Sequence, residues 1–281
     1  MCLKSNISKK FDNILRRKRF AVYAIMKTRK AEALRRRQSI YFLIRFYRLL
    51  FYTEELKEDL AMPVKVGLKF IEKWGESMEK KICEYEKEPI IKGQIVFYGP
   101  SNFTRWAAYR GNTPLREAVL GHSGAQCCIN RGFGSSTTEH QLYYYPRMVR
   151  PLEPKVLVYS VGYGNSAAFG YTTEETWDLA SRVVAYAHED FPDMKIYLCG
   201  PNLYRSRMFK SERLEQEELM DSWIREFAEK MPYCSYIDVN AYEPLHRDDI
   251  YDDDKVHFNH KGYEIYAGLF QEALAEELKA F

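Results

Sequence analysis

Short apolar runs alternate with longer amphipathic stretches over the last two-thirds of the chain. The runs are brief and rich in β-branched and aromatic residues, which is typical of buried strands. They predict strands at residues 94–98, 126–130, 155–161, 195–199 and 235–239. Segments of helical length lie between them, at residues 114–120, after Ser136, after Thr172, at 212–230 and from 261 to the end. Because parallel neighbours need crossover connections, this alternation predicts a five-stranded parallel sheet with helices on both faces.

Two of these helix starts carry the spacing of a capping box. In that motif a Ser or Thr and a Glu three residues later satisfy each other's free backbone amides. The pairs are Ser136 with Glu139 and Thr172 with Glu175. We therefore expect a helix to begin beside each pair.

A different pattern occupies the N-terminal third. In residues 39–52 the polar positions fall on one narrow stripe of an otherwise apolar helix, which must bury most of its surface. Pro63 is suited to open a further helix. The apolar positions of that helix share one face and are Ile71, Trp74, Met78, Ile82 and Tyr85. Residues 89–93 contain Pro and Gly, so we divide the chain into a helical extension, residues 1–88, and an α/β domain, residues 89–281.

The net charge of the whole chain is +3, but the charges are unevenly distributed along it. Residues 1–48 contain 15 basic residues against the two acids Asp12 and Glu32, a net charge of +13, which leaves −10 for the rest of the chain. Three interpretations of residues 1–52 stay open: packing on the domain or on a twin subunit, binding to an anionic membrane surface, and contact with nucleic acid. Packing is the default for aromatic-rich helices, although it does not explain the charge. Nucleic acid is least favoured, because charge alone supports only nonspecific contacts with phosphates.

The N-terminus does not resemble a secretory signal. Its first apolar stretch, residues 20–26, is too short for a signal core, and no small-residue cleavage site follows. Arg45 and Arg48 interrupt the best candidate for a membrane-spanning helix. We expect a cytoplasmic protein, peripheral to a membrane if the basic segment binds one. The six cysteines form no CxxC pair, which favours buried reduced thiols over disulfides or a zinc site.

Residues able to do chemistry gather where the predicted strands end, which is where sites form in parallel sheets. Ser101 follows the first strand, a glycine-rich loop at 130–135 follows the second, and Asn165 follows the third. Asp254 and His257 precede the last helix. A Ser hydroxyl becomes a nucleophile when a nearby base takes its proton, and an Asp three residues before the His can hold the other imidazole nitrogen. The combination fits acyl transfer.

Each of these residues also has a structural interpretation. Ser101 after Gly-Pro could cap a helix, Asn165 could be an ordinary turn residue, and Asp254 could belong to a solvated acidic loop. His257 and His260 lack a convincing third ligand, so we expect no metal and no cofactor.

Over roughly residues 90–281 the chain resembles the SGNH hydrolases, which are also known as GDSL esterases and lipases. Counterparts of the four blocks of that family occur in order. They are Gly99-x-Ser101 after the first strand, NRGFG at 130–134, Asn165 in a glycine-flanked turn, and Asp254-x-x-His257 followed by a stretch similar to HxNxxGY. The resemblance implies a flavodoxin-like three-layer α/β/α domain with a five-stranded parallel sheet.

The resemblance also implies roles for the residues. Ser101, Asp254 and His257 would be the catalytic residues, and the oxyanion hole would consist of the Ser101 amide, the Ser135 amide and the Asn165 side chain. The chain departs from the family at four positions, which are Pro100, Ser135, Tyr163 and Ser166. Pro100 leaves the Ser101 amide intact. The amide of Ser135 stays available provided that this position does not need a positive φ.

From these features we expect a serine esterase that hydrolyses an O-acyl ester through an acyl-enzyme on Ser101. The substrate classes that the resemblance permits are a small acyl group on a carbohydrate and a lipid ester. Two alternatives stay open. One is a non-catalytic binding protein of the same fold, favoured by the four departures, and the other is an acyltransferase that uses the same residues. The sequence indicates no particular oligomeric state.

Overall fold

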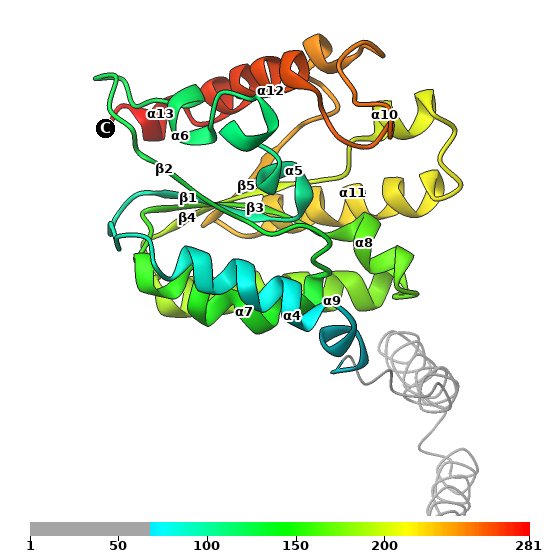
Figure 1. The fold of residues 1–281 in the computed structure, drawn as a ribbon, viewed down its shortest axis with the longest axis horizontal. Coiled ribbons are helices and arrows are strands. Elements are labelled where there is room, and N and C mark those ends of the chain that lie inside the picture. Colours follow the sequence, from blue (N-terminus) through cyan, green and yellow to red (C-terminus); the bar gives the residue numbers. More distant parts are fainter. Residues whose placement is uncertain (1–67) are drawn as a thin grey trace, which may run out of the picture. The chain divides into compact units, whose positions relative to one another are not determined.

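A computed structural model describes the backbone of residues 68–281 and the side chains of residues 76–281 (Figure 1). The described residues belong to one compact unit, Gly67–Phe281. The helix expected at residues 39–52 and the basic segment 1–52 lie outside the described residues.

Five parallel strands form a single sheet, as the sequence predicts. The strands are β1 (Ile95–Gly99), β2 (Cys128–Gly132), β3 (Val156–Ser160), β4 (Lys195–Cys199) and β5 (Cys234–Ile237). Their order across the sheet is β2-β1-β3-β4-β5, with every neighbouring pair parallel. The chain winds in opposite directions on the two sides of β1 and β3, and in open parallel sheets ligand sites form beyond the carboxyl ends of the strands at such a switch point.

Helices cover both faces of the sheet and make the three-layer α/β/α arrangement (Figure 1). One layer holds α4 (Leu68–Tyr85), α7 (Thr138–Met148), α9 (Thr173–Asp190) and α11 (Leu214–Lys230). The opposite layer holds α5 (Ser101–Thr104), α6 (Leu115–Ala118), α12 (His260–Ala273) and α13 (Ala275–Leu278). Two short helices, α8 (Tyr163–Ala168) and α10 (Leu203–Met208), follow β3 and β4. Single 3₁₀ turns are η2 (Ala108–Arg110), η3 (Arg150–Leu152) and η4 (Glu243–Leu245).

The core consists of two apolar layers divided by the sheet. Side chains alternate along β1, so that Val96 and Tyr98 belong to the layer under α4, α7, α9 and α11, whereas Ile95 and Phe97 belong to the layer under α5, α6 and α12. All four are fully buried. Both faces of the sheet are therefore covered, which explains why its strands appear in the sequence as continuous apolar runs.

Helix α4 is part of this folded unit. Met78, Ile82 and Tyr85 are buried on one face, as the periodicity predicts, and Tyr85 Oη donates a 2.6 Å hydrogen bond to the carbonyl oxygen of Gly132 in β2. The compact unit thus begins before residue 89, where the sequence analysis places the start of the domain.

One predicted capping box is confirmed and the other is wrong. Thr172 and Glu175 cap α9 reciprocally, as expected. At α7 the N-cap is Thr137 rather than Ser136, and its partner three residues on is His140, whose ring takes the place of the expected Glu139. Ser136 is fully buried, and its hydroxyl accepts from Gln141 Nε2 at 3.4 Å, while the hydroxyl of Thr137 accepts the His140 amide as the cap.

Between residues 68 and 281, no helix is long and apolar enough to cross a membrane. Of the cysteines in this part of the chain, four are buried and Cys83 is partly buried, and none is in a disulfide.

Candidate active site

The turn that carries Ser101 depends on close backbone approaches. β1 ends at Gly99, where a methyl group would lie 2.8 Å from Ser160 Cβ of the neighbouring strand. Gly132 at the end of β2 has no room either, because an added Cβ would lie 2.5 Å from the Thr104 amide nitrogen. These two glycines let the short helix α5 lie directly against the ends of β1 and β2, which places its first residue, Ser101, just beyond the carboxyl end of β1.

The helix-capping interpretation of Ser101 is wrong. Pro100 is the N-cap of α5 and makes no side-chain capping bond, while Ser101 is the first helical residue. Two further contacts hold this turn in place. Asn130 donates from Nδ2 to the Phe103 carbonyl at 2.7 Å, and Tyr263 of α12 donates from its hydroxyl to the Asn102 carbonyl at 2.8 Å.

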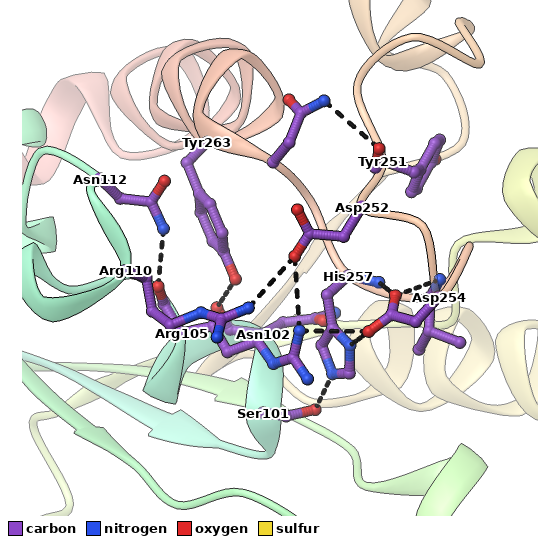
Figure 2. Close-up of polar contacts among 12 residues, drawn as sticks. Ser101, Asn102, Arg105, Arg110, Asn112, Tyr251, Asp252, Asp254, His257 and Tyr263 are labelled. Carbon is purple, nitrogen blue, oxygen red and sulfur yellow. Dashed lines mark hydrogen bonds and ion pairs between the residues drawn. The ribbon is translucent and has the colours of Figure 1, made fainter.

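Ser101, His257 and Asp254 form one hydrogen-bonded chain (Figure 2). Ser101 Oγ lies 2.7 Å from His257 Nε2, and His257 Nδ1 lies 2.8 Å from Asp254 Oδ2. An ionised carboxylate can only accept, so Nδ1 carries the proton and Nε2 accepts from the serine hydroxyl. The three side chains meet from elements 156 residues apart in the sequence.

The acidic loop that presents His257 is closed on itself. Tyr251 and Phe258 form an antiparallel bridge at its base, and the Asp252 amide donates to the His257 carbonyl at 2.8 Å. Asp254 Oδ1 accepts the amides of Val256 and His257, both at 2.9 Å. The D-x-x-H spacing therefore produces a turn in which one carboxylate oxygen binds backbone and the other binds the imidazole.

The electrostatics of the pair keep the histidine neutral and the aspartate ionised. Burial lowers the pKa of His257, the Arg105 charge lowers it further, and the hydrogen bond to Asp254 opposes both, with a net shift below the ordinary histidine value. For Asp254, burial raises the pKa, but bonds from the His257 amide, its ring and the Val256 amide outweigh it and hold this pKa well below its usual range. A neutral imidazole at neutral pH is ready to accept a proton.

The three expected oxyanion donors lie on the three segments that follow the neighbouring strands β1, β2 and β3. The Ser101 amide is the first of α5, and the first amides of a helix have no intrahelical acceptor. Gly134 borders Ser101, since a methyl group there would lie 3.9 Å from Ser101 Cβ. Asn165, in the first turn of α8, donates from Nδ2 to the Ser136 carbonyl at 3.0 Å, which ties it to the segment that contains Ser135. Among the described residues, no hydrogen bond joins Ser135 or Asn165 to Ser101 itself.

Ser135 adopts a φ of 60°, the left-handed region that a glycine would occupy without strain. The position therefore does need a positive φ, contrary to the proviso in the sequence analysis. Serine adopts it at a cost of about 1–2 kcal/mol, and its backbone amide is retained. Ser135 is exposed.

Two other departures from the family have packing roles. The hydroxyl of Ser166 is fully buried, accepts from the Thr138 amide at 3.1 Å and donates to the Gly162 carbonyl at 3.0 Å, which fastens α8 to the start of α7. Tyr163 is buried at the beginning of α8. The close-approach glycine of this turn is Gly162, where a Cβ would lie 2.7 Å from the Ser136 carbonyl oxygen.

His260 points to a different partner and does not complete a metal site. Its Nε2 lies 3.2 Å from Glu264 Oε1 on the next turn of α12. Over the part of the chain that the structure describes, no three His, Cys, Asp or Glu side chains gather as metal ligands would. A cavity of about 290 Å³ between α6 and α12, lined by Trp106, His260 and Gln271 among others, includes neither Ser101 nor His257.

Sequence reasoning missed a group of charged residues beside the hydrogen-bonded chain. Arg105 reaches both Asp254 and Asp252, and Arg110 also reaches Asp252 (Figure 2). The available signal was the position of Arg105, one helical turn after Ser101.

The sequence matches the model of the GDSL-like Lipase/Acylhydrolase family over residues 97–265. No curated protein matches it significantly. Many solved structures are similar, and three of them have TM-scores between 0.51 and 0.56.

The first is a protein from Streptococcus pneumonia, with 15% identity and a TM-score of 0.56, covering 77% of this chain and 100% of that one. The second is a GDSL-like lipase from Bacteroides thetaiotaomicron, with 18% identity and a TM-score of 0.56, covering 71% and 98%. The third is a mutant of an acetyl-xylooligosaccharide esterase from Geobacillus, with 16% identity and a TM-score of 0.51, covering 66% and 95%. At these identities the likeness concerns the fold.

Proposed function

This chain belongs to the GDSL-like lipase and acylhydrolase family and acts on ester bonds, and we propose that it is a serine esterase that removes a small O-acyl group through an acyl-enzyme on Ser101. The observation that carries the proposal is the hydrogen-bonded chain from Ser101 Oγ through His257 to Asp254, with distances of 2.7 and 2.8 Å. A capping serine or a solvated acidic loop has no need of this alignment.

In the first step His257 Nε2 takes the proton of Ser101 as Oγ attacks the acyl carbon. The imidazolium that forms is stabilised by Asp254, whose ionised carboxylate already accepts the Nδ1 proton. The carbonyl oxygen becomes an oxyanion, and we assign its stabilisation to the amides of Ser101 and Ser135 and to the side chain of Asn165.

Collapse of this tetrahedral intermediate breaks the bond to the alcohol oxygen, which receives the proton from His257. The acyl group is then an ester of Ser101. Water enters, gives a proton to Nε2 as it attacks the same carbon, and the second collapse returns the proton to Oγ and releases the carboxylic acid. If another alcohol attacks in place of water, the same groups transfer the acyl chain.

A fluorophosphonate probe tests the assignment of the nucleophile. The full chain is expected to be labelled, and Ser101→Ala is expected to abolish labelling. Ser222→Ala, at an exposed serine of α11, is the matched control and should label like the unaltered protein. A folded protein that takes no label, or Ser101→Ala protein that labels normally, would overturn the proposal.

A series of p-nitrophenyl esters of increasing chain length then tests the acyl group. The acetyl-xylooligosaccharide esterase of the same fold supports a short acyl chain on a carbohydrate. We therefore expect kcat/KM to be highest for the acetyl or propionyl ester and to fall for longer chains. A maximum at long chains would favour a lipid ester, and formation of a new ester in the presence of an added alcohol would favour transfer.

A further inference from the structure

One guanidinium joins the turn that carries Ser101 to the loop that carries His257. Arg105 is the C-cap of α5, and its own amide donates to the Ser101 carbonyl at 2.8 Å. Its Nη1 lies 3.1 Å from Asp254 Oδ2 and 3.4 Å from Asp252 Oδ2. The first of these oxygens is the one that accepts the imidazole Nδ1 proton of His257 (Figure 2).

Neighbouring residues hold the two ends of this contact. Asn112 donates from Nδ2 to the Arg105 carbonyl at 2.8 Å, which fixes the backbone at the end of α5. On the loop side, Arg110 Nη2 also lies 3.4 Å from Asp252 Oδ2, so this carboxylate lies between two guanidiniums. The Arg105 side chain is only 28% exposed, and partial burial strengthens its ion pairs relative to those of a surface arginine.

We propose that Arg105 is a positioning residue that clamps the Asp254 loop to the Ser101 turn and shares the Asp254 carboxylate with His257. The inference rests on the proposed function and adds a residue to its machinery. A four-residue helix and a loop from the far end of the chain need a direct link if the Ser101–His257 distance is to stay near 2.7 Å. Arg105 provides that link by a single side chain.

The same placement gives Arg105 an electrostatic effect on His257. Asp254 and Asp252 on the histidine's own loop favour the imidazolium, whereas Arg105 from the end of α5 disfavours it. Arg110 reaches this loop through Asp252. Removal of the Arg105 charge should therefore raise the pKa of His257, and removal of the Asp252 charge should lower it.

The experiment measures kcat/KM against pH for the full chain and its variants with p-nitrophenyl acetate. For Arg105→Gln we expect a fall of roughly 10-fold to 100-fold, as for a small misplacement of reacting groups. We also expect the acidic limb of the profile to move to higher pH. Arg105→Lys keeps the charge and should restore the limb toward its original pH, with an intermediate rate because lysine lacks the planar fork.

Asp252→Asn is the complementary variant. It distinguishes an electrostatic effect on His257 from a general loss of stability. It should move the acidic limb to lower pH, opposite to Arg105→Gln, which a general loss of stability would not do. Arg116→Gln, at an exposed arginine of α6, is the matched control and should leave rate and limb unchanged.

The inference is overturned if Arg105→Gln lowers the rate without moving the limb, or if both stay unchanged while the unaltered chain is labelled by fluorophosphonate. If the unaltered chain is not labelled at all, the proposed function fails and not this inference alone.

Discussion

His257 has neighbours of both charges, and their balance decides when it can work as a base. Burial and Arg105 disfavour its protonated form, while Asp254 favours it, and the net pKa lies below the ordinary histidine value. Asp254 stays ionised far below neutral pH because three donors from residues 256–257 bind its two oxygens. At the scale of single residues, therefore, the proton acceptor and its partner hold complementary charge states near neutral pH.

The pH dependence of activity follows from this balance. A base works only when it is neutral, so kcat/KM should fall as pH drops through the pKa of His257. Because that pKa is lowered, the fall should begin at a more acidic pH than for an unperturbed histidine, and activity should be retained at mildly acidic pH. A pH–rate profile with p-nitrophenyl acetate checks this. A limb at or above the ordinary histidine value would contradict it.

Asn165 offers a second prediction at this scale. Its side-chain amide is bound through one N–H to the Ser136 carbonyl, and the other is available to an oxyanion. Asn165→Ala should lower kcat by about 10²-fold to 10³-fold with a smaller effect on KM, since the donor acts mainly in the transition state. Steady-state kinetics measures this, and thermal unfolding checks that the protein is folded. A KM effect alone would argue against the role.

At the scale of elements, the sequence predicts the helices and strands that show a clear hydrophobic pattern and misses the helices that are too short to show one. The five strands are recognised as short continuous apolar runs, and the long helices α9, α11 and α12 span enough turns to be recognised. The helices α5, α8 and α10 have four to six residues, too few for a pattern, yet they contain Ser101 and Asn165. The motif residues of the site could therefore be predicted, but not the elements that hold them.

Contacts between elements that are far apart in the sequence could not be predicted from local sequence patterns. Arg105 and Asp254 are 149 residues apart, and no spacing rule connects them. The left-handed backbone at Ser135 lies in the turn after β2, which is bound to α8 by the hydrogen bond from Asn165 to the Ser136 carbonyl, a contact 29 residues apart in the sequence.

The turn after β2 gives a prediction about stability. Ser135→Gly removes the left-handed strain, although glycine also gains entropy in the unfolded chain. We expect a net stabilisation of up to about 1 kcal/mol, which raises Tm by roughly 2–4 °C in a unit of this size. The amide at 135 is kept, so esterase activity should persist. Differential scanning calorimetry checks the shift, and a lower Tm would show that Ser135 is not strained.

For the molecule as a whole, helix α4 decides where the folded unit begins. A chain that starts at residue 89 lacks Met78, Ile82 and Tyr85, which are buried against the sheet. Each such side chain contributes about 1.5–3 kcal/mol, so their loss approaches the total stability of an ordinary domain. We expect this shortened chain to unfold at least 10 °C below the full chain, at roughly 2–4 °C per kcal/mol, or to aggregate.

Thermal unfolding of both chains tests this, with a chain that starts at residue 67 as the control that keeps α4. Equal melting temperatures for the chains starting at 67 and at 89 would contradict it. Membrane binding by the basic segment 1–52 can be tested with two of these proteins. The full chain is compared with the chain that starts at residue 67 by sedimentation with vesicles that contain or lack anionic lipid.

The bond from Tyr85 to Gly132 ends on the strand terminus against which Thr104 and Phe103 lie. Gly132 has no side chain, so the backbones of β2 and of α5 are in direct contact at this point. A displacement of α4 would therefore reach, within two contacts, the backbone of the short helix that begins at Ser101.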